Sequence, residues 1–280
     1  MLRHPDELRE LVEGYLGELA FTPELGALEE AIRYPLASGG KRVRPVISLA
    51  VGEAAGAAAE HVLPAAAAVE LVHTFSLVHD DLPALDDDDL RRGQPSAHVR
   101  FGEDVAILAG DALLAEAFRL ALGYPTPAVA RDLAEATIGM IGGQYVDVTT
   151  NGRLDDESLR ALHELKTGRL LRASILCATS VAELTEEERR PWSEFGAELG
   201  LLFQIVDDIL DATGTVDELG KTPGKDEEAG KATYVSVHGI DDARALADEA
   251  RARVLERLGA LDADTSVLAE LVSAIRERRG

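Results

Sequence analysis

The sequence predicts an all-α protein that forms a single domain of packed helices. Of its 280 residues, 46% are apolar and only 4% aromatic, a composition that favours helices over sheets. No run alternates apolar and polar residues for long enough to predict a sheet. Two apolar helices each end in a dense cluster of aspartates, which suggests acidic walls that face each other across a cavity. The sequence contains no linker-like or low-complexity tract, so residues 1–280 are expected to form one domain.

Composition excludes several classes of protein. The formal net charge of −23 argues against nucleic acid as a partner, because a phosphate backbone requires a basic surface. The single cysteine, Cys177, rules out a disulfide framework and fits a reducing compartment. No early apolar segment suits export, and Glu70 interrupts the most apolar run. We therefore expect a cytoplasmic protein without stable membrane insertion.

The N-terminal helices lead to a basic turn. An amphipathic helix is expected over residues 6–19, followed by a second helix that Pro35 ends and a loop over residues 38–40. A third helix then opens with three cations, Lys41, Arg42 and Arg44. Cations at a Gly-Gly turn before a helix can bind an anion. A solvated basic loop explains the same residues equally well.

The first acidic cluster follows an apolar helix over residues 61–79. Six aspartates lie between positions 80 and 89, and Pro83 places the later ones on an irregular turn. His73 lies seven residues before Asp80 and therefore on nearly the same face, although a lone histidine is more often a satisfied core residue. Carboxylate oxygens suit a hard cation such as Mg²⁺. An EF-hand is excluded because Arg91 stands where that loop needs glycine, whereas a solvated acidic loop remains the alternative.

The central helices carry small residues and a lysine. Helices are expected over residues 105–120 and around Gly142-Gly143-Gln144, where small residues permit close approach. A capped helix start is predicted at residues 154–157. Lys166 lies in the helix that follows, and because burial of an unpaired lysine is costly, it lies on the surface or faces an anion.

The second acidic cluster lies on a helix that is expected to begin at Pro191. Its polar residues at i, i+3, i+4 and i+7 predict one stripe, formed by Gln204, Asp207, Asp208 and Asp211. The remaining positions are apolar and would be buried. Carboxylates on one face of a mostly buried helix destabilise the protein unless a cation joins them, so a metal site is favoured over a solvated face.

A loop rich in glycine and lysine follows this helix, with Lys221, Lys225 and Lys231. These lysines could reach a metal-bound diphosphate, and a solvated loop is the alternative. Amphipathic helices over residues 241–258 and 265–278 are expected to close the chain. The basic tail over residues 276–279 could cover the site.

Five motifs, in order, resemble those of the trans-isoprenyl diphosphate synthases (polyprenyl synthetases) of the bacterial short-chain type. They are Gly39–Pro45, Asp80–Asp86 with Asp89–Gly93, Gly143–Asp147, Lys166–Gly168 and Phe203–Asp211. The resemblance covers nearly the whole chain and implies an all-α bundle around a deep central cavity, usually paired as a homodimer. It implies an Mg²⁺-dependent prenyltransferase that joins isopentenyl diphosphate head to tail to dimethylallyl or geranyl diphosphate. Farnesyl diphosphate is the expected product, and geranylgeranyl diphosphate the alternative.

The resemblance also implies roles for residues. The expected ligands of about three Mg²⁺ ions are Asp80, Asp81, Asp86, Asp207, Asp208 and Asp211. The residues expected to hold the allylic diphosphate are Arg91, Lys166, Thr167, Gln204, Lys221 and Lys231. Those expected to hold isopentenyl diphosphate are Lys41, Arg44, His73 and Arg92. Within these sets, the residues expected to be catalytic are Asp80, Asp86, Arg91, Lys166, Asp207 and Lys221. Chain length is expected to depend on Phe75 and Ser76.

Physical chemistry accounts for these residue types. Carboxylate-held Mg²⁺ lowers the barrier to departure of a polyanionic leaving group, and nearby cations stabilise the developing charge. A dry apolar lining protects a carbocation from water.

A class I terpene cyclase is less favoured because Asp211 stands where its second motif needs a hydroxyl. A non-catalytic subunit would lack an aspartate or a diphosphate-binding cation, and an acidic scaffold does not explain Arg91 or Lys166.

Overall fold

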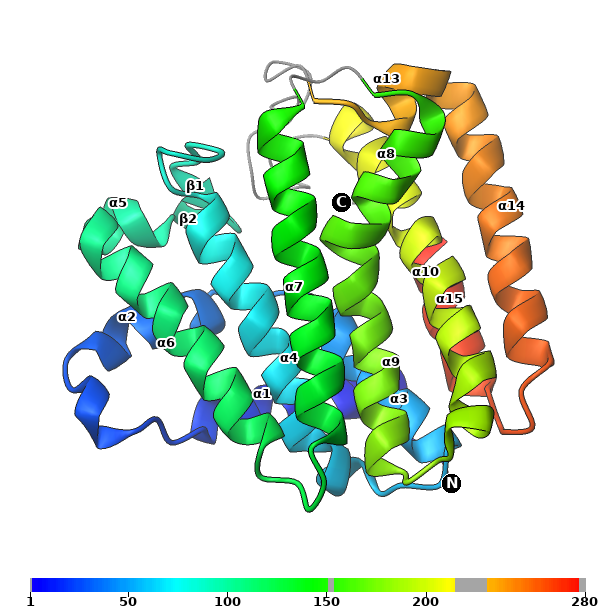
Figure 1. Ribbon diagram of the computed structural model, residues 1–280, viewed down its shortest axis with the longest axis horizontal. Coiled ribbons are helices and arrows are strands. Elements are labelled where there is room, and N and C mark those ends of the chain that lie inside the picture. The colour runs from blue at the N-terminus through cyan, green and yellow to red at the C-terminus, as the bar shows by residue number, and fades with distance from the viewer. Residues whose placement is uncertain (1, 151–153, 215–230, 277–280) are drawn as a thin grey trace.

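The computed structural model describes residues 2–150, 154–214 and 231–276. This part of the chain is almost entirely helical (Figure 1). The helices are α1 (Pro5–Glu18), α2 (Leu28–Ala37), α3 (Val43–Ala54), α4 (Ala59–Asp80), α5 (Ala97–Phe101), α6 (Glu103–Ala121), α7 (Ala128–Thr149), α8 (Asp156–His163), α9 (Arg169–Val181), α10 (Glu186–Thr213), α13 (Tyr234–His238), α14 (Ile240–Gly259) and α15 (Ser266–Arg276). Two short segments complete them, the 3₁₀-helix η1 (Pro23–Leu25) and the π-helix η2 (Glu164–Gly168).

Helix α4 forms the centre of the bundle and packs against α3, α6 and α9. It is apolar on all sides, as expected for a helix surrounded by protein. By length and composition it could also cross a membrane, but most of it is buried inside the bundle. The sequence argument that Glu70 interrupts this run is wrong, because Glu70 is itself buried and is paired with Arg42 Nη1 at 2.7 Å.

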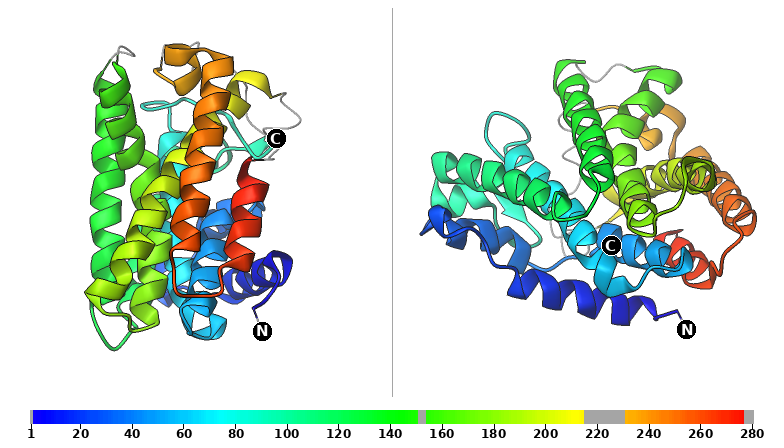
Figure 2. Two further views of the ribbon diagram at one scale, coloured as in Figure 1. Left: turned by 90° about the vertical axis from the view of Figure 1, so that its right-hand side faces the viewer. Right: turned by 60° about the horizontal axis from the view of Figure 1, so that its bottom comes forward.

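Two hydrophobic clusters make up the core. One joins α1, α3, α10, α14 and α15, the other joins α2, α6 and α7, and both include residues of α4 and α9. Figure 2 shows the long helices side by side, with the N-terminal helices along one side of the bundle. The prediction of a single-domain, all-α helical bundle is confirmed.

Several element boundaries differ from those expected. Pro35 lies inside α2, in its last turn, rather than ending it. Helix α10 begins before Pro191, because Thr185 and Glu188 form a capping box that starts the helix at Glu186. The sequence also predicted no sheet, yet β1 (Leu90–Arg91) pairs with antiparallel β2 (Gln94–Pro95) in a hairpin.

The bundle brings the two acidic clusters to one end. Asp80 is the last residue of α4, and the second cluster lies near the C-terminal end of α10. Figure 1 shows both helix ends at the top of the molecule, together with the hairpin, α8 and α13. This end of the bundle therefore holds the candidate site.

Candidate active site

The loop after α4 folds back so that the two outer aspartates of the first motif become neighbours. The backbone N–H of Asp86 donates to the carbonyl of Asp80 at 2.8 Å, and that of Asp88 donates to the carbonyl of Asp81 at 3.1 Å. Asp87 takes a left-handed conformation with φ 49° to allow the turn. Asp80 and Asp86, six positions apart in the sequence, are thereby brought close together by a loop rather than by a helix.

Burial and nearby lysines set the ionisation of these two carboxylates. Burial raises the pKa of Asp80 to about 6, and Asp86 adds to the rise while Lys166 opposes it. Burial would also raise the pKa of Asp86, but Lys231 and Lys166 outweigh it and hold this pKa below its usual range. The charge of Lys166 therefore favours the ionised form of both carboxylates.

A chain of ion pairs joins four separate segments at this end. Lys231 Nζ lies 2.8 Å from Asp86 Oδ1 and 3.9 Å from Asp147 Oδ2, and Lys166 Nζ lies 2.5 Å from the same oxygen of Asp147. The structure thus brings Asp86, Lys166 and Lys231 together, as expected. Sequence reasoning gave no role to Asp147, although its place in the Gly143–Asp147 motif was the available signal.

Lys166 and Thr167 are presented by η2 rather than by a regular helix. A Cβ on Gly143 of α7 would lie 2.4 Å from the backbone nitrogen of Lys166, and one on Gly200 of α10 would lie 2.9 Å from the Cα of Gly168. Only glycine permits these close approaches. A single π-helical turn held between two helices is a frequent feature of functional sites.

The second acidic motif does not form the single stripe that was expected. Asp207 is exposed, whereas Asp208 and Asp211 are buried. Asp208 Oδ1 accepts a hydrogen bond from Gln204 Nε2 at 2.7 Å, and Oδ2 accepts one from the backbone N–H of Tyr234, also at 2.7 Å. Neighbouring helix positions point about 100° apart, so Asp207 and Asp208 cannot share one environment here.

Asp81 and Arg91 are paired with each other. Asp81 is buried, and its carboxylate accepts hydrogen bonds from the Arg91 guanidinium. Burial raises the pKa of Asp81, and Arg91 opposes that rise. In this structure Asp81 therefore orients Arg91, while the expected roles of Asp81 on a metal and of Arg91 on a diphosphate remain predictions.

The basic turn and His73 form a second cationic region. The Arg92 guanidinium donates to the carbonyl of Gly39 and lies so close to Gly40 that a Cβ there would meet it at 2.8 Å. Arg44 Nη1 lies 3.5 Å from His73 Nε2. Burial, followed by Arg44 and Arg92, holds the pKa of His73 well below its usual range. Three of the four residues expected to hold isopentenyl diphosphate thus come together, with Lys41 exposed beside them.

The two residues expected to set chain length, Phe75 and Ser76, are consecutive residues of α4 with different surroundings. Phe75 is buried, and its ring meets that of His79 edge to face at 5.0 Å. The Ser76 hydroxyl donates to the carbonyl of His73 at 2.8 Å. Lys221, Lys225 and the tail over residues 277–279 lie outside the described residues.

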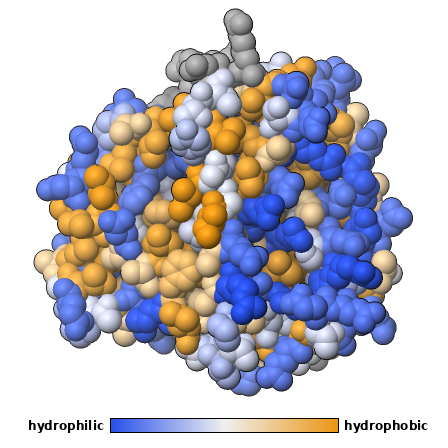
Figure 3. Space-filling view, in the orientation of Figure 1, coloured by the Kyte–Doolittle hydropathy of each residue, from blue (hydrophilic) through white to orange (hydrophobic). Residues whose placement is uncertain are grey.

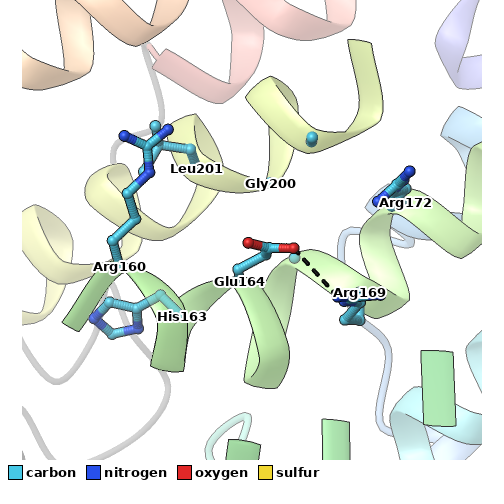
Figure 4. Close-up of a pocket in the computed structure, with 9 residues that line it drawn as sticks. Arg160, His163, Glu164, Arg169, Arg172, Gly200 and Leu201 are labelled. Atoms are coloured by element: carbon cyan, nitrogen blue, oxygen red, sulfur yellow. Dashed lines mark ion pairs between the residues drawn. The ribbon is translucent and has the colours of Figure 1, made fainter. Parts of the chain in front are cut away.

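A small surface groove lies beside η2 (Figure 4). Figure 4 shows Glu164 and Arg169, an ion pair at 3.4 Å, across from Gly200 and Leu201 of α10. The groove lies on the α10 side of η2, whereas Lys166 reaches Asp147 on the α7 side. It is therefore separate from the candidate site.

The acidic residues offer only oxygen donors, the chemistry that Mg²⁺ prefers. Burial of Asp80 beside Asp86 is unfavourable for two negative charges, and a divalent cation would relieve it. Among the described residues, no three acidic or histidine side chains lie close enough to enclose a metal ion. Lys166 and Lys231 lie among these carboxylates instead. The residues therefore fit a metal ion that is held partly by carboxylates and partly by a bound phosphate group.

Comparisons with known proteins identify the family of the chain. The Polyprenyl synthetase family model matches residues 26–275. The geranylgeranyl diphosphate synthase of Cyanophora paradoxa is 40% identical over 270 residues, covering 91% of this chain and 90% of that protein. A solved geranyltransferase from Helicobacter pylori, in complex with magnesium and isoprenyl diphosphate, is 31% identical with a TM-score of 0.83, covering 97% of this chain and 94% of the other.

The fold and the paired acidic and basic side chains define an all-α enzyme of the isoprenoid synthase type. The chain belongs to the polyprenyl synthetase family and is a short-chain trans-prenyltransferase. A relative from Arabidopsis thaliana, 44% identical over 252 residues (85% of this chain, 68% of that protein), is named the large subunit of a heterodimeric geranylgeranyl pyrophosphate synthase.

The cytoplasmic location expected from the sequence is wrong by this comparison. Relatives from Arabidopsis thaliana, Catharanthus roseus and Capsicum annuum, which are 44%, 44% and 42% identical, are named chloroplastic enzymes. A single buried cysteine is compatible with any reducing compartment, so composition could not separate these locations.

Proposed function

We propose that this protein is a geranylgeranyl diphosphate synthase, which extends an allylic diphosphate with isopentenyl diphosphate. The observation that carries the proposal is the 40% identity, over nine-tenths of both chains, to a synthase with that name. This identity favours geranylgeranyl diphosphate, the alternative product, over farnesyl diphosphate, the product expected from the sequence. Similarity to geranyltransferases at 30–31% identity keeps farnesyl diphosphate as the second candidate.

In this proposal the chain's own residues bind, orient and shield the reactants. Lys166 and Lys231 would exchange Asp147 and Asp86 for the oxygens of the allylic diphosphate and so stabilise the charge that develops as the carbon–oxygen bond breaks. Arg44 and Arg92 would hold isopentenyl diphosphate beside neutral His73. The new carbon–carbon bond then forms between the allylic carbon and the isopentenyl double bond, and the released diphosphate takes up the proton that the new carbon skeleton loses.

We propose Mg²⁺ as the metal. Asp80 and Asp86 of the first motif and Asp207 of the second would supply carboxylate oxygens to ions that the substrate diphosphate also helps to hold. When bound, Mg²⁺ would neutralise the diphosphate and assist its departure as a leaving group. The oxygen-only donors support this assignment, as does the magnesium in the similar H. pylori enzyme. We further propose that residues 1–280 form one polyprenyl synthetase domain, since both core clusters share α4 and α9.

We also propose a homodimer. Large apolar side chains are exposed at i, i+3, i+7 and i+10 along α7, namely Ile138, Ile141, Tyr145 and Val148, and Ile107 and Leu108 of α6 are exposed as well. Figure 3 shows hydrophobic residues gathered over this face. An apolar stripe of this kind favours a partner surface, and a second copy of the chain is the proposed partner.

Product analysis tests the proposed activity. Purified protein is incubated with Mg²⁺, isopentenyl diphosphate and each of dimethylallyl, geranyl and farnesyl diphosphate, and the products are identified after removal of the diphosphate. A twenty-carbon product from all three starters is expected. A product that stops at fifteen carbons would support the second candidate, and failure to condense any starter would contradict both.

Phe75 supplies a test of product length. Because its ring is buried in the second core cluster and meets the ring of His79, Phe75→Ala should open space and lengthen the product relative to the wild-type product. Val99→Ala, at a side chain of α5 that is 50% exposed, is the control and should leave the product unchanged. An unchanged product from Phe75→Ala would locate the limit on chain growth elsewhere.

A further inference from the structure

The carboxylate of Asp208 is held by the segment that follows the second motif. Asp208 is only 5% exposed. One of its oxygens accepts from Gln204, the other accepts from the backbone N–H of Tyr234, and His163 Nε2 lies 3.7 Å away. Charge-assisted hydrogen bonds of this kind to backbone N–H groups are strong. Asp208 therefore fastens the first residue of α13 to α10.

Ring stacking and a second carboxylate fasten the rest of α13. The Tyr234 ring stacks on the ring of His163, the last residue of α8, with 5.4 Å between ring centroids, and on the ring of His238, with 6.1 Å between centroids. His238 Nε2 lies 2.8 Å from Asp156 Oδ1 at the start of α8. A helix of five residues cannot be stable alone, so these contacts fix its position. We refer to Asp208, His163, Tyr234, His238 and Asp156 as the α13 anchor.

The α13 anchor controls where Lys231 lies. Lys231 precedes Tyr234 by three residues, and its ammonium reaches Asp86 at 2.8 Å and approaches Asp147 at 3.9 Å. The side chain crosses from the α10 side of the bundle to the first acidic motif. With α13 fixed at both ends, the lysine has few other positions available, and its charge is pre-organised at the site.

We propose that Asp208 is a positioning residue, and not a metal ligand: through the α13 anchor it holds Lys231 at the acidic site. This positioning role replaces the role as a metal ligand that the second motif suggested for Asp208. Asp207, which is exposed at the preceding position of α10, remains the proposed metal ligand. The inference rests on the proposed function only for the identity of the anion that Lys231 meets.

Hydrogen–deuterium exchange of the metal-free, substrate-free protein tests the anchor directly. Asp208→Ala removes both acceptors, so exchange of amides in residues 231–238 should rise at least about tenfold, while α4 and α6 keep their protection. Asp208→Asn retains an oxygen for the Tyr234 N–H, and Gln204 can turn its amide to match, so this variant should restore most of the protection. Asp207→Asn, the matched control, should leave exchange unchanged.

Steady-state kinetics separate positioning from metal binding. In Asp208→Ala, KM for the allylic diphosphate should rise about tenfold or more because Lys231 is displaced, with the Mg²⁺ concentration for half-maximal rate unchanged within about twofold. Asp207→Asn should instead raise the Mg²⁺ concentration for half-maximal rate and leave KM for the allylic diphosphate unchanged within about twofold. Lys231→Met should reproduce the KM change without the change in exchange.

Specific results would overturn the proposal. Unchanged exchange in Asp208→Ala, or a raised Mg²⁺ requirement in Asp208→Asn, would assign Asp208 to the metal instead. If Asp208→Ala does not fold, His238→Ala weakens the anchor from its other end and should give the same selective rise in exchange. A wild-type protein without prenyltransferase activity would refute the proposed function, yet the exchange result would stand independently of it.

Discussion

At the scale of single residues, Asp80 combines a functional role with a cost in stability. Its pKa is raised to about 6, chiefly by burial and further by Asp86. A raised carboxyl pKa means that the folded protein disfavours the charged form, so above pH 6 the ionised Asp80 lowers the free energy of unfolding of the metal-free protein. The sequence identified this residue, but only the fold revealed how unfavourable its environment is.

We predict that Asp80→Asn lowers kcat/KM by at least about 10²-fold, because an amide cannot replace a carboxylate on Mg²⁺. The same substitution should raise the free energy of unfolding of the metal-free protein at pH 7.5 by roughly 1–3 kcal/mol. Urea unfolding and steady-state kinetics measure the two effects. Asp89→Asn, whose side chain is 81% exposed, is the control and should change neither. Wild-type turnover in Asp80→Asn would remove the metal assignment.

His73 gives the free energy of unfolding a pH dependence opposite in sign to that of Asp80. Its pKa in the folded protein is held well below the usual value by burial and then by Arg44, whereas the unfolded chain takes up a proton near pH 6.5. Below pH 6.5 the unfolded state therefore binds more protons, and stability falls as the pH falls.

We predict that wild-type protein loses roughly 1 kcal/mol more unfolding free energy than His73→Gln between pH 7.5 and 5.5. Glutamine keeps a polar side chain near Arg44 but does not titrate. Urea unfolding at each pH measures the difference between the two proteins. Parallel stability curves for both would show that His73 titrates normally.

At the scale of elements, the position of Lys166 depends on the contact between α7 and η2. Gly143 lies where any Cβ would meet the backbone of Lys166 at 2.4–2.7 Å. Because those atoms belong to the backbone, they cannot move aside as a flexible side chain would.

We predict that Gly143→Ala lowers the free energy of unfolding by roughly 1–3 kcal/mol and raises KM for the allylic diphosphate, because η2 must shift. Its neighbour Gly142 has no atom within 4 Å of a built Cβ, so Gly142→Ala should be neutral or slightly stabilising through helix propensity. Denaturant unfolding and kinetics on the two variants test the contact. Equal behaviour of both alanine variants would contradict it.

The elements also show what sequence reasoning could reach. Apolar periodicity predicted α4, α6, α10 and α14, because burial against neighbours dominates their stability. It misplaced the start of α10, since the Thr185 capping box outweighs Pro191. It could not predict η2, because a π-helical turn arises from tertiary packing between Gly143 and Gly200.

The same limit applies to the candidate site. Motif spacing identified the aspartates and Lys231, but an ideal helix places Asp207 and Asp208 on one polar stripe. The structure separates them, because α13 packs over Asp208 and leaves Asp207 exposed. Contacts between segments distant in sequence, such as Lys231 with Asp86, cannot be deduced from periodicity.

At the scale of the whole molecule, the exposed apolar stripe on α6 and α7 contrasts with the strongly acidic chain. The side chains of Ile138 and Tyr145 are each 70% exposed, although the formal net charge is −23. Such charge keeps copies of the chain apart unless apolar contact outweighs repulsion. Because screening by salt weakens repulsion but not apolar burial, association should strengthen as ionic strength rises.

We predict that the wild-type protein has about twice the monomer mass of 29.9 kDa in light scattering, and that Ile138→Glu with Ile141→Glu yields monomers, since both place charge in the apolar interface. Val237→Glu, at an apolar residue that is 39% exposed away from α6 and α7, is the control and should remain dimeric. Raising the salt concentration should partly restore dimers of the double variant by screening its added charges. A wild-type monomer at micromolar concentration would contradict the homodimer, and a dimeric double variant would place its interface on another face.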